Sequence, residues 1–82
     1  TIMNDDPMEM ADRLMRYVDD LIRFRREKDT RRISGRILMI QNVLEKLRLS
    51  YEVALFPPGI IERIRREMER ADLPASFEKY EF

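Results

Sequence analysis

The chain has 82 residues, with sixteen basic and sixteen acidic side chains and neither cysteine nor histidine. A chain of this size buries roughly 60% of its unfolded surface, so it forms one small domain, residues 1–82, that oligomerisation would stabilise. It is either a complete protein or a piece of a larger one. The missing cysteine and histidine exclude disulfides, thiolate chemistry and the usual zinc sites. The balanced charge argues against a dedicated polyanion-binding protein, whose domain is usually strongly basic.

No apolar run approaches the ~18 residues of a membrane span, and the sequence shows no signal peptide. We therefore expect no membrane partner. A cysteine-free composition is compatible with an intracellular, cytoplasmic location, which is the expected compartment.

The first predicted helix covers residues 7–28. Proline is favoured in a first turn, and Asp6 or Asp5 can act as the N-cap before Pro7. The apolar residues follow helical spacing: Ala11, Leu14, Met15, Val18, Leu21 and Ile22. A second stripe on one flank consists of Met10, Tyr17 and Phe24. An apolar arc this wide is typical of a helix that packs against two neighbours.

The second predicted helix covers residues 31–56, after a short connection at residues 29–30. One helical phase joins Ile33, Ile37, Ile40, Leu44, Leu47, Tyr51, Ala54 and Leu55. That continuity favours a single long helix over a helix followed by a strand at residues 50–56. Gly35 within the helix either permits close approach of the first helix or is simply tolerated, at about 1 kcal/mol relative to alanine.

The third predicted helix covers residues 58–72, with a narrow apolar stripe of Ile60, Ile61, Ile64, Met68 and Ala71. The tail, residues 75–82, has three aromatic side chains but no period that assigns a structure. Two long helices joined by a tight turn form an antiparallel hairpin, and the third helix lies across it. The predicted fold is an all-α three-helix bundle, to which dimerisation could add a further helix face.

The tetrapeptide YVDD at residues 17–20 holds catalytic metal in reverse transcriptases, where a β-hairpin presents it. Here it lies within a predicted helix, and Asp19 and Asp20 diverge by about 100°. Arg16 and Arg23 are at helical spacing from both aspartates. We interpret the aspartates as a solvated, charge-paired face. The serines have no histidine to activate them, and no glycine-rich phosphate loop exists. The sequence therefore predicts a protein that is not an enzyme and uses no metal or cofactor.

The segment 23–48 carries nine basic and three acidic residues, a net charge of +6. Basic clusters attract phosphate through counterion release, and Phe24 could stack on a base. This pattern supports an alternative hypothesis, a nucleic-acid-associated protein. Its phosphate contacts would be Arg23, Arg25, Arg26, Lys28, Arg31, Arg32 and Arg36.

The first two predicted helices carry more apolar side chains than they can bury against each other. On the second helix, several apolar residues lie opposite the main stripe, and the Met10 flank of the first helix adds more. Either the third helix and the tail cover these residues, or a partner helix does. The leading hypothesis is a non-catalytic protein-interaction or oligomerisation module whose partner is a second copy or another helical protein. The predicted interface consists of Met10, Tyr17, Phe24, Leu38, Leu49, Val53 and Phe56.

Overall fold

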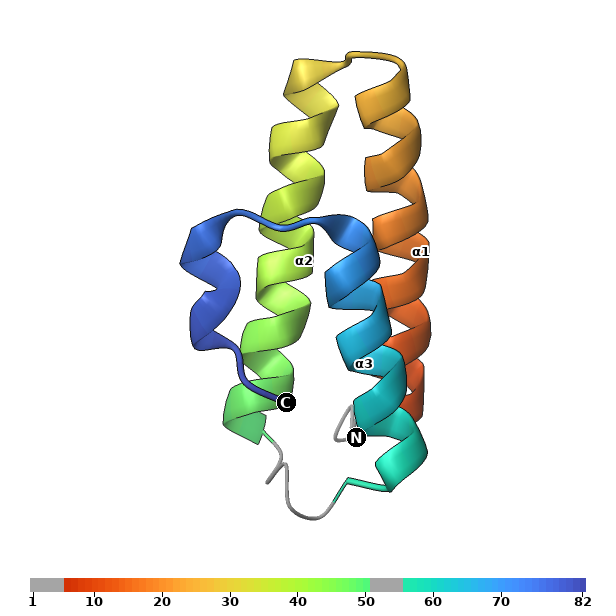
Figure 1. Cartoon of the computed structure of the whole chain (residues 1–82), viewed down its shortest axis with the longest axis vertical. Coiled ribbons are helices and arrows are strands. Elements are labelled where there is room, and N and C mark those ends of the chain that lie inside the picture. Colours follow the sequence, from red (N-terminus) through yellow and green to blue (C-terminus); the bar gives the residue numbers. More distant parts are fainter. Residues whose placement is uncertain (1–5, 51–55) are drawn as a thin grey trace, which may run out of the picture.

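The computed structural model describes residues 6–50 and 56–82. These residues form α1 (Pro7–Arg26), α2 (Thr30–Ser50), α3 (Pro58–Ala71) and a short 3-10 helix, η2 (Ala75–Lys79), with no strand among them. Figure 1 shows α1 and α2 as an antiparallel hairpin and α3 running back alongside α1. The predicted all-α three-helix bundle is confirmed.

The turn between α1 and α2 explains why α1 ends two residues before the predicted boundary. Lys28 adopts a left-handed conformation with φ of 55°. Its N–H donates to the carbonyl of Arg25 at 3.1 Å, and the N–H of Asp29 donates to the carbonyl of Phe24 at 3.0 Å. These two bonds form a Schellman motif, which satisfies carbonyls at the end of the helix. The Asp29 carboxylate then accepts from the N–H of Arg32 at 3.2 Å and caps α2.

The start of α1 follows the prediction. Asp6 is the N-cap, and its carboxylate accepts from the N–H of Glu9 at 2.9 Å. Pro7 occupies the first helical turn, where its missing N–H costs nothing.

The second helix was predicted to cover residues 31–56, and the described part of α2 is Thr30–Ser50. Residues 51–55 lie outside the described part of the chain. Phe56 is in a bend and is buried, so the last residue of the predicted helix is not helical. Pro57 precedes α3, and a residue before proline disfavours the helical conformation.

The core is built from all three helices and from the tail. Fully buried side chains come from α1, from α2 and from α3, and the largest are Met10, Leu14, Val18, Leu21, Ile40, Leu44, Leu47 and Ile64. The tail, which the sequence left unassigned, adds Phe77 and Tyr80, whose ring centroids are 5.8 Å apart. Met15, predicted on the core stripe of α1, is exposed.

The tail contacts both α2 and α3. Arg48 of α2 lies over the ring of Tyr80, with its Cζ 6.0 Å from the ring centroid. Arg65 of α3 donates to the carbonyl of Phe82. The tail is therefore held in place from both helices, and this explains how a short aromatic segment becomes part of the core.

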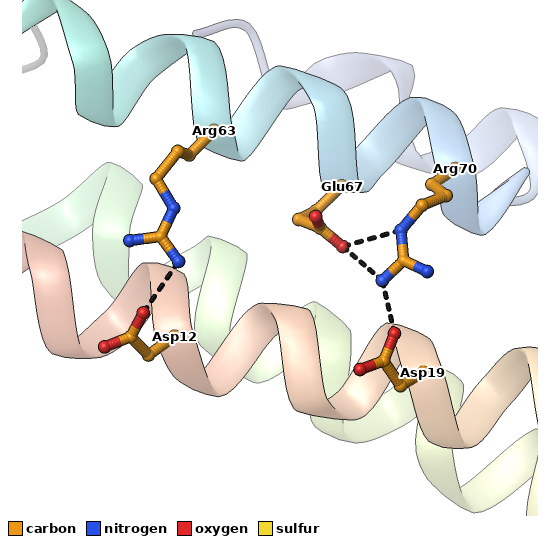
Figure 2. Close-up of polar contacts among 5 residues, drawn as sticks. All are labelled: Asp12, Asp19, Arg63, Glu67 and Arg70. Atoms are coloured by element: carbon orange, nitrogen blue, oxygen red, sulfur yellow. Dashed lines mark hydrogen bonds and ion pairs between the residues drawn. The ribbon is translucent and has the colours of Figure 1, made fainter.

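Two ion-pair groups connect α1 to α3 (Figure 2). Arg63 lies 2.6 Å from Asp12, and Arg70 lies 2.6 Å from both Asp19 and Glu67. Both ion pairs between the helices, Arg63 with Asp12 and Arg70 with Asp19, join residues that are 51 positions apart. The constant offset means that α1 and α3 run parallel and in one register. Asp12 and Asp19 are one heptad apart on α1, as Arg63 and Arg70 are on α3.

Asp19 was predicted to pair with arginines of its own helix, and that prediction is wrong. Its partner is Arg70, because α3 packs along this side of α1. Hydrogen bonds to Glu67 and Asp19 raise the pKa of Arg70 above its ordinary value, and burial acts in the opposite direction. The cation is therefore more strongly favoured at neutral pH, and the pair loses its charge through Arg70 only in strong alkali.

Candidate functional surfaces of the helical hairpin

One candidate surface is the side of α2 that faces away from the core. Leu38 is 60% exposed and Leu49 is 72% exposed, the two highest values for large apolar side chains in the described part of the chain. They are eleven residues apart, about 16 Å along the helix at ~1.5 Å per residue. Asn42, which is exposed, and Glu45, which is half-buried with its Oε2 atom covered, lie between them, each seven residues from one of the leucines. We call Leu38, Asn42, Glu45 and Leu49 the outer face of α2.

The predicted interface residues differ in how far the structure buries them. Met10, Phe24 and Phe56 are buried within the chain, so their apolar surface is already covered. Tyr17 is half-buried, with the Cζ of Arg36 at 5.2 Å from its ring centroid. Val53 lies outside the described residues. Leu38 and Leu49 remain, because they alone of the seven have their side chains exposed in the described part of the chain.

The second candidate surface is a groove between α1 and α2 near their connecting turn. It is open to solvent and has a volume of about 430 Å³, and its lining residues, which we call the arginine groove, are Arg23, Phe24, Arg32, Gly35, Arg36 and Met39. The groove lies beside α2 rather than on its outer face. Three of the seven predicted phosphate contacts are therefore brought together in one place.

The three groove arginines surround one aromatic ring. The Cζ atoms of Arg23, Arg36 and Arg32 lie 5.0, 5.6 and 5.7 Å from the ring centroid of Phe24. Each cation–π contact at such a site contributes about 0.5–1 kcal/mol. Phe24 is 4% exposed. The suggestion that this ring stacks on a nucleic-acid base is therefore wrong, because the arginines and the helices already cover it.

Two carboxylates accompany these arginines. Asp20 lies 3.4 Å from Arg23 through one oxygen and 3.4 Å from Arg36 through the other. Asp29 lies 3.5 Å from Arg32. The second aspartate of the YVDD tetrapeptide is thus a partner of two arginines, one on its own helix and one on α2.

The other basic residues of the turn have different surroundings. Arg25 points to α3, where it donates to the carbonyls of Ala71 and Asp72 and satisfies the end of that helix. This structural role makes Arg25 a poor phosphate contact. Arg26, Lys28 and Arg31 are exposed.

Close packing does not explain why residue 35 is a glycine in the described structure. A Cβ atom built on it would meet no atom within 4 Å, so the residue does not allow a close approach of α1, as one reading of the sequence suggested. Gly35 lines the arginine groove instead.

Sequence reasoning missed two features of the groove. Met39 was not assigned to any surface, and the contact between Asp20 and Arg36 was not expected. Helical spacing could have placed Met39, since it is seven residues after Arg32 on the same side of the helix. The contact between Asp20 and Arg36 depends on how the two helices are aligned, which spacing along one helix does not contain.

In the part of the chain that the structure describes, no group of three or more acidic side chains converges as a metal site would require. Across the same residues, no helix is both long enough and apolar enough to span a membrane. Searches against protein families, curated proteins and solved structures find no match for the chain. The fold places the chain in the class of all-α three-helix bundles. Its function must be inferred from the two surfaces.

Proposed function

We propose that the protein is a non-catalytic oligomerisation module that forms a homodimer through the outer face of α2. The observation that carries this proposal is the order of residues on that face. Leu38, Asn42, Glu45 and Leu49 are separated by four, three and four residues, so the spacing reads the same in both directions. A two-fold interface uses the same patch on both copies and therefore needs such self-complementarity.

Antiparallel pairing of α2 with α2 of a second copy uses every residue of this pattern. Leu38 of each copy meets Leu49 of the other, and Asn42 meets Glu45. The asparagine amide donates a hydrogen bond and the carboxylate accepts it through Oε1, since Oε2 of Glu45 is buried within the chain, so the two polar residues are matched. Parallel pairing would instead place Glu45 against Glu45, and like charges in contact disfavour binding.

The size of the chain supports the same conclusion. A domain of 82 residues without disulfides has a small core, and a second copy would bury the two most exposed leucines. Each leucine side chain that is removed from water contributes about 1.5–3 kcal/mol.

Sedimentation equilibrium of the chain tests the proposal. We expect a species of twice the 10.0 kDa chain mass at micromolar concentration. Leu38→Glu together with Leu49→Glu should weaken the dimer by at least ~100-fold, because charges would be buried in the interface. Ser76→Glu, on the exposed part of η2, is the control for an added charge and should leave the mass unchanged. A chain that is monomeric at all concentrations, or a dimer that survives the double substitution, would refute the proposal.

Asn42→Lys distinguishes the two orientations. In the antiparallel dimer the new lysine faces Glu45 of the other copy, so the dimer should become tighter by a few-fold. A parallel dimer would place two lysines together and become weaker. Weakening by this substitution would therefore contradict the antiparallel arrangement while leaving dimerisation itself in place.

A further inference from the structure

We propose that the arginine groove binds a phosphate group, carried either by a nucleic-acid backbone or by a free nucleotide. This inference does not depend on the dimer. The groove lies between α1 and α2, whereas the proposed dimer uses the outer face of α2. Three observations support it: the arrangement of the arginines, the geometry of their ion pairs, and Gly35.

The arginines form a compact cationic cluster. All three Cζ atoms lie within 5.7 Å of one ring centroid, so they are at most about 11 Å apart. Two carboxylates, Asp20 and Asp29, accompany three guanidinium groups, and the groove keeps a net charge of +1. Exposed Arg26, Lys28 and Arg31, together with the exposed acidic Glu27, add a net charge of +2 at the same end of the hairpin. Arginine is well suited to phosphate because its guanidinium donates two parallel hydrogen bonds.

The ion pairs within the groove are long. The three contacts measure 3.4, 3.4 and 3.5 Å, whereas the pairs that join α1 to α3 measure 2.6 Å. A charge-assisted hydrogen bond has a length of about 2.7–2.9 Å, so the groove contacts are weaker than direct bonds. The groove arginines therefore retain hydrogen-bonding capacity that a phosphate can use.

Gly35 keeps the wall of the groove open. Glycine within a helix costs about 1 kcal/mol relative to alanine, and nothing packed against Gly35 offsets that cost. Any side chain at this position would extend into or beside the groove that Gly35 lines. The groove volume of about 430 Å³ falls within the ~300–1,000 Å³ typical of ligand sites. It can hold a phosphate with part of the group attached to it.

Fluorescence anisotropy at low salt tests the site. The probe is a labelled single-stranded oligonucleotide, and the competitors are an unlabelled duplex, a nucleoside triphosphate and inorganic phosphate. We expect binding that weakens steeply as salt is raised. Competition by the triphosphate at concentrations comparable to the oligonucleotide identifies a nucleotide site. Competition by nucleic acid alone identifies a backbone site, and either result supports the groove.

Two matched pairs of variants locate the binding. Arg32→Gln in the groove and Arg66→Gln on the exposed side of α3 remove the same charge. The first should weaken binding about tenfold, the loss expected for one charge-assisted partner, and the second should change it less than twofold. Gly35→Glu adds a carboxylate at the groove wall, and Gly35→Gln adds an uncharged side chain of the same shape. The glutamate variant should bind at least about tenfold more weakly than the glutamine variant.

Circular dichroism of each variant verifies that the helices are retained, which the open space at Gly35 and the exposure of Arg32 lead us to expect. The proposal is overturned if none of the phosphate probes binds at low salt. It is equally overturned if Arg32→Gln and Arg66→Gln have the same effect, or if the two Gly35 variants bind alike, since binding would then follow net charge rather than the groove.

Discussion

The two ends of the hairpin are stabilised by different means. Where α1 begins, its apolar side chains share one core with α2, α3 and the aromatic tail. Near the turn between α1 and α2, Phe24 is buried but does not belong to that core, and three arginines surround its ring. Figure 1 shows the hairpin extending beyond the end of α3 toward this turn.

The comparison shows how a two-helix segment can exclude water from an aromatic ring without a third helix. The alkyl stems and guanidinium groups of arginine cover the ring, while their charges stay at the surface. The same arginines are the ones that we propose to bind phosphate. The end with the shared core gains its stability from apolar burial. At the end with the turn, arginine side chains cover the aromatic ring less completely than a helix would, and the surface there is charged.

The largest effect is expected from the shared core. Leu44→Ala removes a fully buried side chain and should lower the free energy of unfolding by about 2–5 kcal/mol, because a cavity remains. Leu38→Ala makes the same chemical change on the outer face of α2. In urea unfolding at concentrations where the protein is monomeric, it should cost less than about 0.5 kcal/mol. Equal losses would mean that Leu38 is not exposed in solution.

A smaller effect is expected at the turn. Arg36→Ala removes cation–π contacts with Tyr17 and Phe24 and the ion pair with Asp20. The expected loss in free energy of unfolding is about 1–2 kcal/mol. Arg36→Lys should lose part of it, since lysine keeps the charge but not the planar group. Exposed Arg31→Ala is the control, and a loss there as large as that of Arg36→Ala would show that the rings contribute nothing specific.

The smallest expected effect is an increase in the free energy of unfolding. Gly35→Ala should raise the free energy of unfolding by about 0.5–1 kcal/mol, because alanine favours the helix and its Cβ meets no atom within 4 Å. Thermal unfolding would show this as a higher midpoint. A loss of stability would mean that α1 approaches Gly35 more closely than the structure describes, and would remove Gly35 from the argument for the groove.

Much of the fold follows from local signals. The caps at Asp6 and Pro7 and the apolar period of α1 predict that helix to within two residues, because capping and periodicity depend on neighbours in sequence. The candidate surfaces are less accessible to such reasoning. Met10 and Leu38 both look like surplus apolar residues in the sequence, yet one is fully buried and the other is 60% exposed.

The sequence by itself determined the helices, the hairpin and the side of each helix that is apolar. The tertiary structure decided which surplus apolar residues are covered, and it placed Phe77 and Tyr80 in the core. It also showed that the partner of Asp19 is Arg70 of α3, rather than an arginine of its own helix. The physical reason is the same in each case. Helical period and capping act over a few residues, whereas burial and ion pairing depend on segments about 50 positions away that only folding brings together.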